Sequence, residues 1–250
     1  MKAANYSTPM LRLRYTSEND TAMPKRDFWM LPVAIGVLLL LVYWVDNYFF
    51  LDLYKFGLLP RSWSGLWGIL VTPFVHSSVS HLLNNLLPLV LLVLAIRYFY
   101  PAVSTRVLIS GYLITGVLVW FIARDSYHIG ASGQVYAFAS FLFFSGIIHG
   151  KIHLLAIALL VAFLYGGLIW GIFPFHSHVS WESHLAGGFT GLITALYFRH
   201  HEPFYTSPFK DMEANETAYI RHSPRAPVEY ETSITDIRYR FITYHIEKKK

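Results

Sequence analysis

The chain has 250 residues, of which 14% are charged and 54% hydrophobic, and its 20 Lys and Arg against 15 Asp and Glu give a net charge of +5. A typical soluble domain has about 25% charged residues, so the composition excludes a water-soluble globule. The absence of cysteine excludes disulfide scaffolds, thiolate nucleophiles, iron–sulfur clusters and cysteine-ligated zinc. The excess of Lys and Arg fits the flanks of membrane spans, so we expect no nucleic-acid partner.

The charged residues divide the chain into three parts. Only ten of the 35 lie between Phe28 and Phe198. We therefore expect a polar N-terminal tail over residues 1–27, a membrane domain over 28–198 and a charged C-terminal tail over 199–250. The predicted fold class is an all-α membrane protein, a bundle of six transmembrane helices with polar cytoplasmic tails. The helices are expected at the apolar runs 28–45, 81–96, 107–123, 130–148, 152–172 and 183–198.

Two further segments are expected outside the spans. Residues 46–80 are apolar but broken by Gly, Pro and Trp, which favours a loop at the membrane interface.

Six crossings place both termini on one side, and Lys and Arg are more frequent near the helix ends on that side, so both termini are predicted to be cytoplasmic. In the tail, alternation over Ile234–Tyr239 indicates a strand or small accessory element, with disorder as the alternative.

Polar residues stand at the predicted extracytoplasmic ends of three helices. His81 and Asn85 are four residues apart, so they share one helix face and can both donate hydrogen bonds to a common point. Ser132 lies within Gly130-Ala131-Ser132-Gly133 at a loop-to-helix junction, where a hydroxyl is accessible and backbone N–H groups are free. Taken singly, each pattern is more typical of ordinary helix packing than of a functional site.

The last apolar run carries a third polar group beside a small-residue face. Gly187 and Gly191 form a G-x-x-x-G spacing that allows close packing against another helix, and His184 lies one turn earlier on nearly the same side. If the partner is the helix that begins at Ser132, His184 meets Ser132. A nucleophile, a base and donors for an oxyanion are then present together, as a Ser-His dyad.

On these residues the chain resembles the rhomboid family of intramembrane serine proteases. The matching pieces are His81-x-x-x-Asn85, Gly130-x-Ser132-Gly133 and His184-x-x-Gly187-x-x-x-Gly191, in the family's order. The resemblance implies that Ser132 is the nucleophile and His184 the general base. It further implies an oxyanion hole formed by His81 and Asn85 with the Ser132 N–H, an open loop at Gly130, and supporting roles for Tyr136 against the His ring and for Gly187 and Gly191.

The resemblance also predicts a reaction. It implies hydrolysis of peptide bonds in or near transmembrane segments of membrane proteins, with no metal or organic cofactor and with the site open to the extracytoplasmic side. A polar rim that includes Ser126, His128 and His176–His178 is expected to hold the water. His76 fits a family position that orders the first loop, whereas Gly68 follows Trp67 where the family usually has Arg. A bacterial inner membrane is the expected location, and the oligomeric state stays open.

Two other functions remain open from the sequence. Twelve His residues, with the pair His176 and His178, are consistent with a metal-binding membrane transporter, although no acidic residue lies within the predicted spans and the HExxH motif is absent. The alternative within the family is a non-catalytic protein that binds membrane clients without cutting them. The chain retains both Ser132 and His184, which favours the protease.

Overall fold

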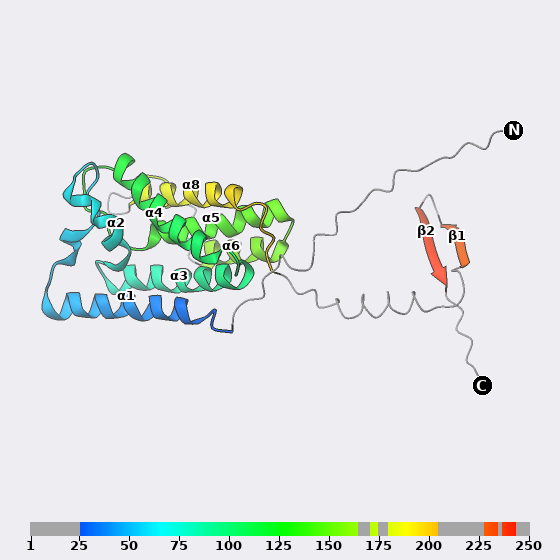
Figure 1. The fold of residues 1–250 in the computed structure, drawn as a ribbon, viewed down its shortest axis with the longest axis horizontal. Helices are drawn as coiled ribbons and strands as arrows, with labels where there is room; N and C mark the ends of the chain where they lie inside the picture. Colours follow the sequence, from blue (N-terminus) through cyan, green and yellow to red (C-terminus); the bar gives the residue numbers. More distant parts are fainter. Residues whose placement is uncertain (1–25, 165–170, 175–179, 205–227, 235–236, 244–250) are drawn as a thin grey trace. The chain divides into compact units, whose positions relative to one another are not determined.

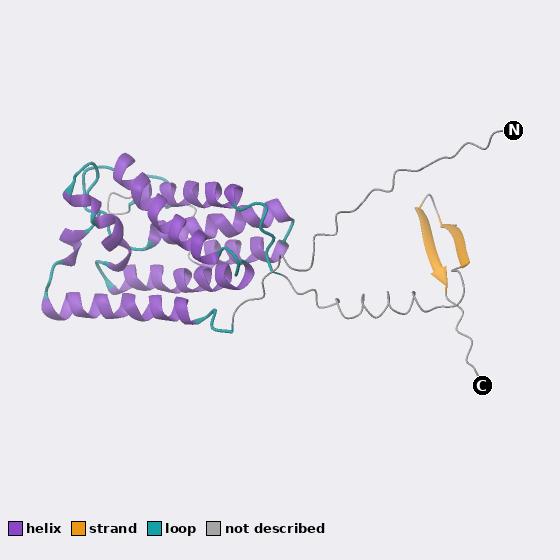
Figure 2. Ribbon diagram, in the orientation of Figure 1, coloured by secondary structure: helices purple, strands orange, loops and turns teal. Residues whose placement is uncertain are grey.

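A computed structural model describes residues 26–164, 171–174, 180–204, 228–234 and 237–243. The chain divides into two compact units, residues 1–204 and 205–250. In the described part of the first unit the regular elements are helices, and in the second unit they are two strands (Figure 2).

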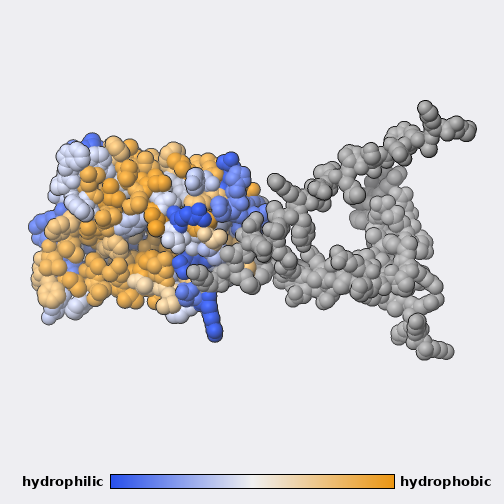
Figure 3. Space-filling view, viewed as in Figure 1, coloured by the Kyte–Doolittle hydropathy of each residue, from blue (hydrophilic) through white to orange (hydrophobic). Residues whose placement is uncertain are grey.

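The first unit is a helical bundle with an apolar surface. Helix α1 (Met30–Phe49) runs beside α3 (Val79–Phe99), and α4 (Ser104–Ile122) follows (Figure 1). These three are the described helices that are long and apolar enough to cross a membrane. Hydrophobic side chains cover much of the face of the bundle in Figure 3. The protein is therefore an integral membrane protein.

The remaining helices are shorter and pack around α5. Helix α5 (Ser132–His149) contacts α3, α4, α6 (Ile152–Leu164) and α8 (Trp181–Tyr197). Six described helices thus coincide with the six predicted apolar runs to within a few residues, except that residues 165–170 of the run 152–172 lie outside the described part. The six-crossing topology itself stays a prediction, because α5, α6 and α8 do not meet the length and hydropathy that mark the other three.

The segment between α1 and α3 is helical in short pieces, not the plain loop that its Gly and Pro residues predict. It contains η1 (Leu53–Phe56), η2 (Ser64–Leu66), α2 (Gly68–Val71) and η3 (Thr72–Phe74). A Cβ atom on Gly68 would overlap the backbone of Leu58, so no arginine fits there. Arg61 instead ties this segment to α4, donating to the carbonyl of Ala123 at 2.6 Å and pairing with Asp125.

The C-terminal unit adds strands to the predicted all-α class. Strands β1 (Val228–Ile234) and β2 (Ile237–Thr243) pair antiparallel, with Ile234 opposite Ile237 and Val228 opposite Thr243. The alternation predicted over Ile234–Tyr239 coincides with the last residue of β1 and the first three residues of β2, and residues 235–236 lie outside the described part of the chain. The all-α class holds for the described residues up to Phe204, and the described part of the tail departs from it by two antiparallel strands.

Candidate active site

Ser132 is the first residue of α5 and follows a loop that only glycine can form. Gly130 has φ of +97°, a left-handed conformation that side chains disfavour, and its N–H donates to the carbonyl of Thr72 at 2.9 Å. The chain then turns directly into the helix. The Ser132 hydroxyl and the first backbone N–H groups of α5 consequently lie at the helix start, where those N–H groups have no partner within the helix.

His184 lies in the first turns of α8 and is hydrogen-bonded to Ser132. Its Nε2 atom is 2.8 Å from Ser132 Oγ, and its Nδ1 atom is 2.8 Å from the carbonyl oxygen of Gly171. A carbonyl oxygen only accepts, so Nδ1 carries the proton of the neutral ring. Nε2 is left as the acceptor for the serine hydroxyl, which is the arrangement that a general base requires.

Packing holds α5 and α8 at the distance that this bond needs. A Cβ on Gly187 would overlap the carbonyl of Gly133, and one on Gly191 would overlap the carbonyl of Ala137. The ring of Tyr136 stacks on His184 with centroids 4.2 Å apart and planes at 10°. The imidazole is only 8% exposed, so stacking and burial fix its orientation.

His81 and Asn85 reach the same place from α3. Ser78 caps α3 by accepting from the N–H of His81 at 3.1 Å, which sets the helix start and the shared face. A Cβ on Gly130 would lie 2.5 Å from His81 Nε2 and 3.6 Å from Asn85 Nδ2. Both nitrogens therefore face the backbone two residues before Ser132.

The tautomer of His81 follows from a contact that the sequence did not reveal. The backbone N–H of Ser77 donates to His81 Nδ1 at 3.4 Å, and the Ser77 hydroxyl lies 3.2 Å from the same atom. Nδ1 thus accepts, and Nε2 carries the proton that points toward Gly130. Asn85 Nδ2 donates to the His81 carbonyl at 2.8 Å, and its second N–H is available because an amide nitrogen has two.

A second set of polar groups joins the α4–α5 loop to the start of α8. His128 Nδ1 is 2.5 Å from Ser180 Oγ, which lies 2.6 Å from Ser183 Oγ. Arg124 pairs with the buried Glu182 at 3.5 Å. The side chains at the start of α8 are thereby linked by hydrogen bonds and an ion pair to the loop that leads to Ser132. No sequence pattern indicates this set, because its residues are far apart along the chain.

The predicted water-holding rim is wrong at His128. This side chain is 2% exposed and bridges Ser180 and the carbonyl of Arg124, and its burial lowers the pKa of the imidazole. Residues 176–178 of the predicted rim lie outside the described part of the chain. In the described residues, no three His, Asp or Glu side chains lie close enough together to hold a metal ion.

His76 lies behind His81. Their ring centroids are 5.0 Å apart, and His76 is 3% exposed. Neither ring nitrogen makes a hydrogen bond of normal geometry. Burial is the larger effect and lowers the pKa of the imidazole to about 4, whereas the nearby backbone of Phe74 raises it slightly. The side chain is therefore neutral near pH 7.

The helical part of the chain is similar to known proteins. A profile of the Rhomboid domain matches residues 64–201, more than half of the chain. An uncharacterized protein of Mycobacterium tuberculosis is 32% identical over 150 residues, which cover 56% of this chain and 62% of the relative. An uncharacterized protein of Mycobacterium leprae is 28% identical over 208 residues, which cover 77% of this chain and 81% of the relative. Rhomboid-related protein 2 of Mus musculus is 28% identical over 149 residues, which cover 53% of this chain and 48% of the relative. The chain thus spans less than two thirds of the M. tuberculosis relative.

Proposed function

Because the chain belongs to the rhomboid family, we propose that it is an intramembrane serine endopeptidase that cleaves other membrane proteins in or near their transmembrane segments. The observation that carries the proposal is the 2.8 Å contact between Ser132 Oγ and His184 Nε2, on a ring whose other nitrogen donates to Gly171. This contact joins two helices across the interior of an apolar bundle. Ionisable groups in such places are costly and usually functional.

In the proposed reaction Ser132 Oγ attacks the carbonyl carbon of the scissile peptide while His184 Nε2 takes the hydroxyl proton. The carbonyl oxygen becomes an oxyanion beside His81, Asn85 and the Ser132 N–H. His184 then gives its proton to the leaving nitrogen, and an acyl ester remains on Ser132. A water molecule, deprotonated by the same ring, hydrolyses the ester and restores the hydroxyl.

The substrate must present an unwound peptide bond. In a helix the carbonyl oxygens accept backbone hydrogen bonds, so a transmembrane substrate has to open locally before Ser132 can reach it. The chemistry requires only side chains and water. The partners that follow are single-span or multi-span membrane proteins and the lipids around them.

The placement in the membrane is part of the proposal. Six crossings with Lys and Arg concentrated on one side favour cytoplasmic termini and a site open to the extracytoplasmic face, and we place the six-helix domain in a bacterial inner membrane. The chain lacks cysteine, so single cysteines report topology without background labelling. In intact cells a membrane-impermeant maleimide should label Ser64→Cys, between α1 and α3, and spare His200→Cys, after α8.

The activity is tested with a fluorophosphonate serine probe. We expect the wild-type protein to be labelled and Ser132→Ala and His184→Ala to remain unlabelled. Ser140→Ala is the matched control, since this α5 hydroxyl also bonds across to α8, donating to the carbonyl of Gly188 at 2.6 Å. The protease is supported if the probe labels Ser140→Ala and does not label Ser132→Ala. A wild-type protein that folds but takes no label indicates the client-binding alternative.

A further inference from the structure

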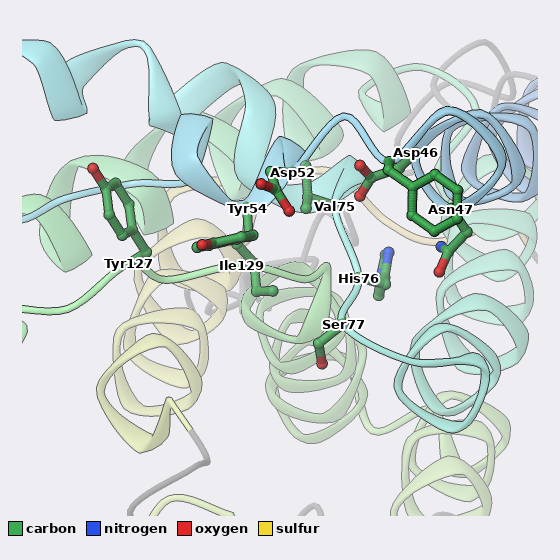
Figure 4. A pocket seen from close by; sticks show the side chains of 10 residues that line it. Asp46, Asn47, Asp52, Tyr54, Val75, His76, Ser77, Tyr127 and Ile129 are labelled. Atoms are coloured by element: carbon green, nitrogen blue, oxygen red, sulfur yellow. The ribbon is translucent and has the colours of Figure 1, made fainter.

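A cavity of about 410 Å³ opens beside the candidate active site. It lies where the end of α1 meets the segment before α3 and the α4–α5 loop. The lining residues that matter for its chemistry are Asp46, Asp52, Tyr54, His76, Ser77 and Tyr127 (Figure 4). The lining therefore contains two carboxylates and no Lys or Arg.

Both carboxylates are held in place by local structure. Asp46 Oδ1 accepts from the N–H of Leu53 at 3.1 Å. Asp52 Oδ2 accepts from Lys55 Nζ at 2.7 Å, so this carboxylate already binds an ammonium group on its outer side. Figure 4 shows the oxygens of Asp46 directed toward the side on which Asp52 lies. A cation between them would be attracted by both.

His76 supplies an independent sign of a missing ligand. It is 97% buried and lines the cavity, and apart from the nearby backbone of Phe74 its ring nitrogens have no hydrogen-bond partner. Figure 4 shows the ring pointing toward the side of the cavity that holds Asp46 and Asn47. Buried polar groups are normally satisfied, and a neutral imidazole has one nitrogen that only accepts. An occupant with N–H donors would satisfy it.

The aromatic walls suit the same occupant. Tyr54 and Tyr127 form an edge-to-face pair with ring centroids 6.4 Å apart. Lys55 Nζ lies 5.7 Å from the Tyr54 centroid, so this ring already faces one cation. Ring faces attract ammonium and guanidinium groups, and guanidinium also stacks on them.

Two residues of the cavity wall are direct neighbours of the candidate active site. Ser77, on its wall, contacts Nδ1 of His81, and Ile129, also on its wall, is bonded to Gly130. We propose that the cavity binds a Lys or Arg side chain of the substrate close to the scissile bond and thereby selects where substrates are cut. This inference rests on the proposed protease function and adds the class of residue that the enzyme recognises.

The test uses the full-length protein in liposomes of phosphatidylglycerol and phosphatidylcholine. Single-span peptides carry one Lys, Leu or Glu, moved one residue at a time along the extracytoplasmic end of the span. At one position we expect kcat/KM for Lys to exceed that for Leu by about tenfold, the equivalent of one favourable contact of roughly 1.4 kcal/mol. Glu should be the poorest of the three.

Variants assign the preference to the cavity. Asp46→Asn and Asp52→Asn should bring the Lys-to-Leu ratio of kcat/KM close to one, whereas Lys55→Met should raise it by freeing Asp52. Asp125→Asn is the control, because it removes a charge from the α4–α5 loop without lining the cavity and should leave the ratio unchanged. A ratio lowered equally by Asp125→Asn would mean a general effect of surface charge and would overturn the proposal.

The remaining outcomes separate this inference from the proposed function. Equal kcat/KM for Lys, Leu and Glu at every position overturns the inference while leaving the protease intact. If no peptide is cleaved, the proposed function fails, and binding of the labelled peptides to Ser132→Ala decides the inference. Tighter binding of the Lys peptide that Asp46→Asn abolishes supports the cavity. Peptide binding without charge preference, but with a requirement for added phosphatidylethanolamine, assigns the cavity to a lipid amine instead.

Discussion

His184 Nε2 lies 2.8 Å from Ser132 Oγ across 52 residues of sequence, with the opposite ring nitrogen bonded to the carbonyl of Gly171. The second bond fixes which nitrogen holds the proton, and it does so with a backbone group. A carboxylate is not needed for this purpose. Glu182, the nearest acidic residue in the sequence, is instead paired with Arg124. The Ser132–His184 pair is thus oriented by the main chain.

Replacing His184 should abolish cleavage without unfolding the protein. His184→Asn retains a polar group that can still reach Gly171 but supplies no base. We expect kcat to fall by at least about 10²- to 10⁴-fold, the usual contribution of a positioned general base. The measurement is single-turnover cleavage of a fluorogenic transmembrane peptide, with thermal unfolding in detergent as the control. Retention of more than a tenth of the rate would remove His184 from the mechanism.

Removing either oxyanion donor should lower turnover more than binding. Asn85→Ala and His81→Ala each delete an N–H donor beside Gly130, and we expect kcat to fall on the order of 10²-fold or less with KM little changed. Asn84→Ala is the matched control on the same turn of α3. Its side chain approaches Ser80 at 3.5 Å. Full activity of both donor variants would show that the oxyanion is stabilised elsewhere.

His81 should also depend on Ser77 for its proton position. Ser77→Pro removes the backbone N–H that donates to Nδ1, whereas Ser77→Ala removes only the hydroxyl. If the backbone N–H sets the tautomer, Ser77→Pro lowers kcat several-fold and Ser77→Ala stays close to wild type. The ¹⁵N chemical shifts of the His81 ring report the tautomer directly. A shift pattern with the proton on Nδ1 in wild type would contradict this assignment.

Much of the bundle could be read from the sequence because apolar runs in a membrane protein have few alternatives to helices. The order of His81, Ser132 and His184 at helix starts placed the three groups at one end of the bundle. The sequence could not show the carbonyl of Gly171, since every residue has a carbonyl and only folding selects one. It also placed His128 at a wet rim, because a histidine in a short polar loop does not reveal that Ser180 will cover it.

Neighbouring glycines in α8 should behave differently. A Cβ on Gly187 would overlap the carbonyl of Gly133, whereas a Cβ on Gly188 meets nothing within 4 Å. We expect Gly187→Ala to separate α5 from α8, destabilising the protein by a few kcal/mol and abolishing probe labelling of Ser132. Gly188→Ala should be neutral or stabilise by up to about 1 kcal/mol through helix propensity. Thermal unfolding and probe labelling measure both. Equal tolerance of the two substitutions would disprove the close-packing argument.

Acid should destabilise the protein through His76. Burial lowers the pKa of this imidazole from 6.5 to about 4 in the folded state, so the unfolded chain takes up a proton first as pH falls. The neutral ring contributes fully to the free energy of unfolding above about pH 6.5. As the pH falls from there to about 4, the free energy of unfolding decreases by about 1.4 kcal/mol per pH unit, or roughly 3 kcal/mol in total. His76→Gln should reduce the slope of the unfolding midpoint against pH in this window and leave the part that comes from the buried His128, whereas the exposed His200→Gln should leave the slope as steep as in wild type. An unchanged slope in His76→Gln would show that the buried ring is not the group that acid attacks.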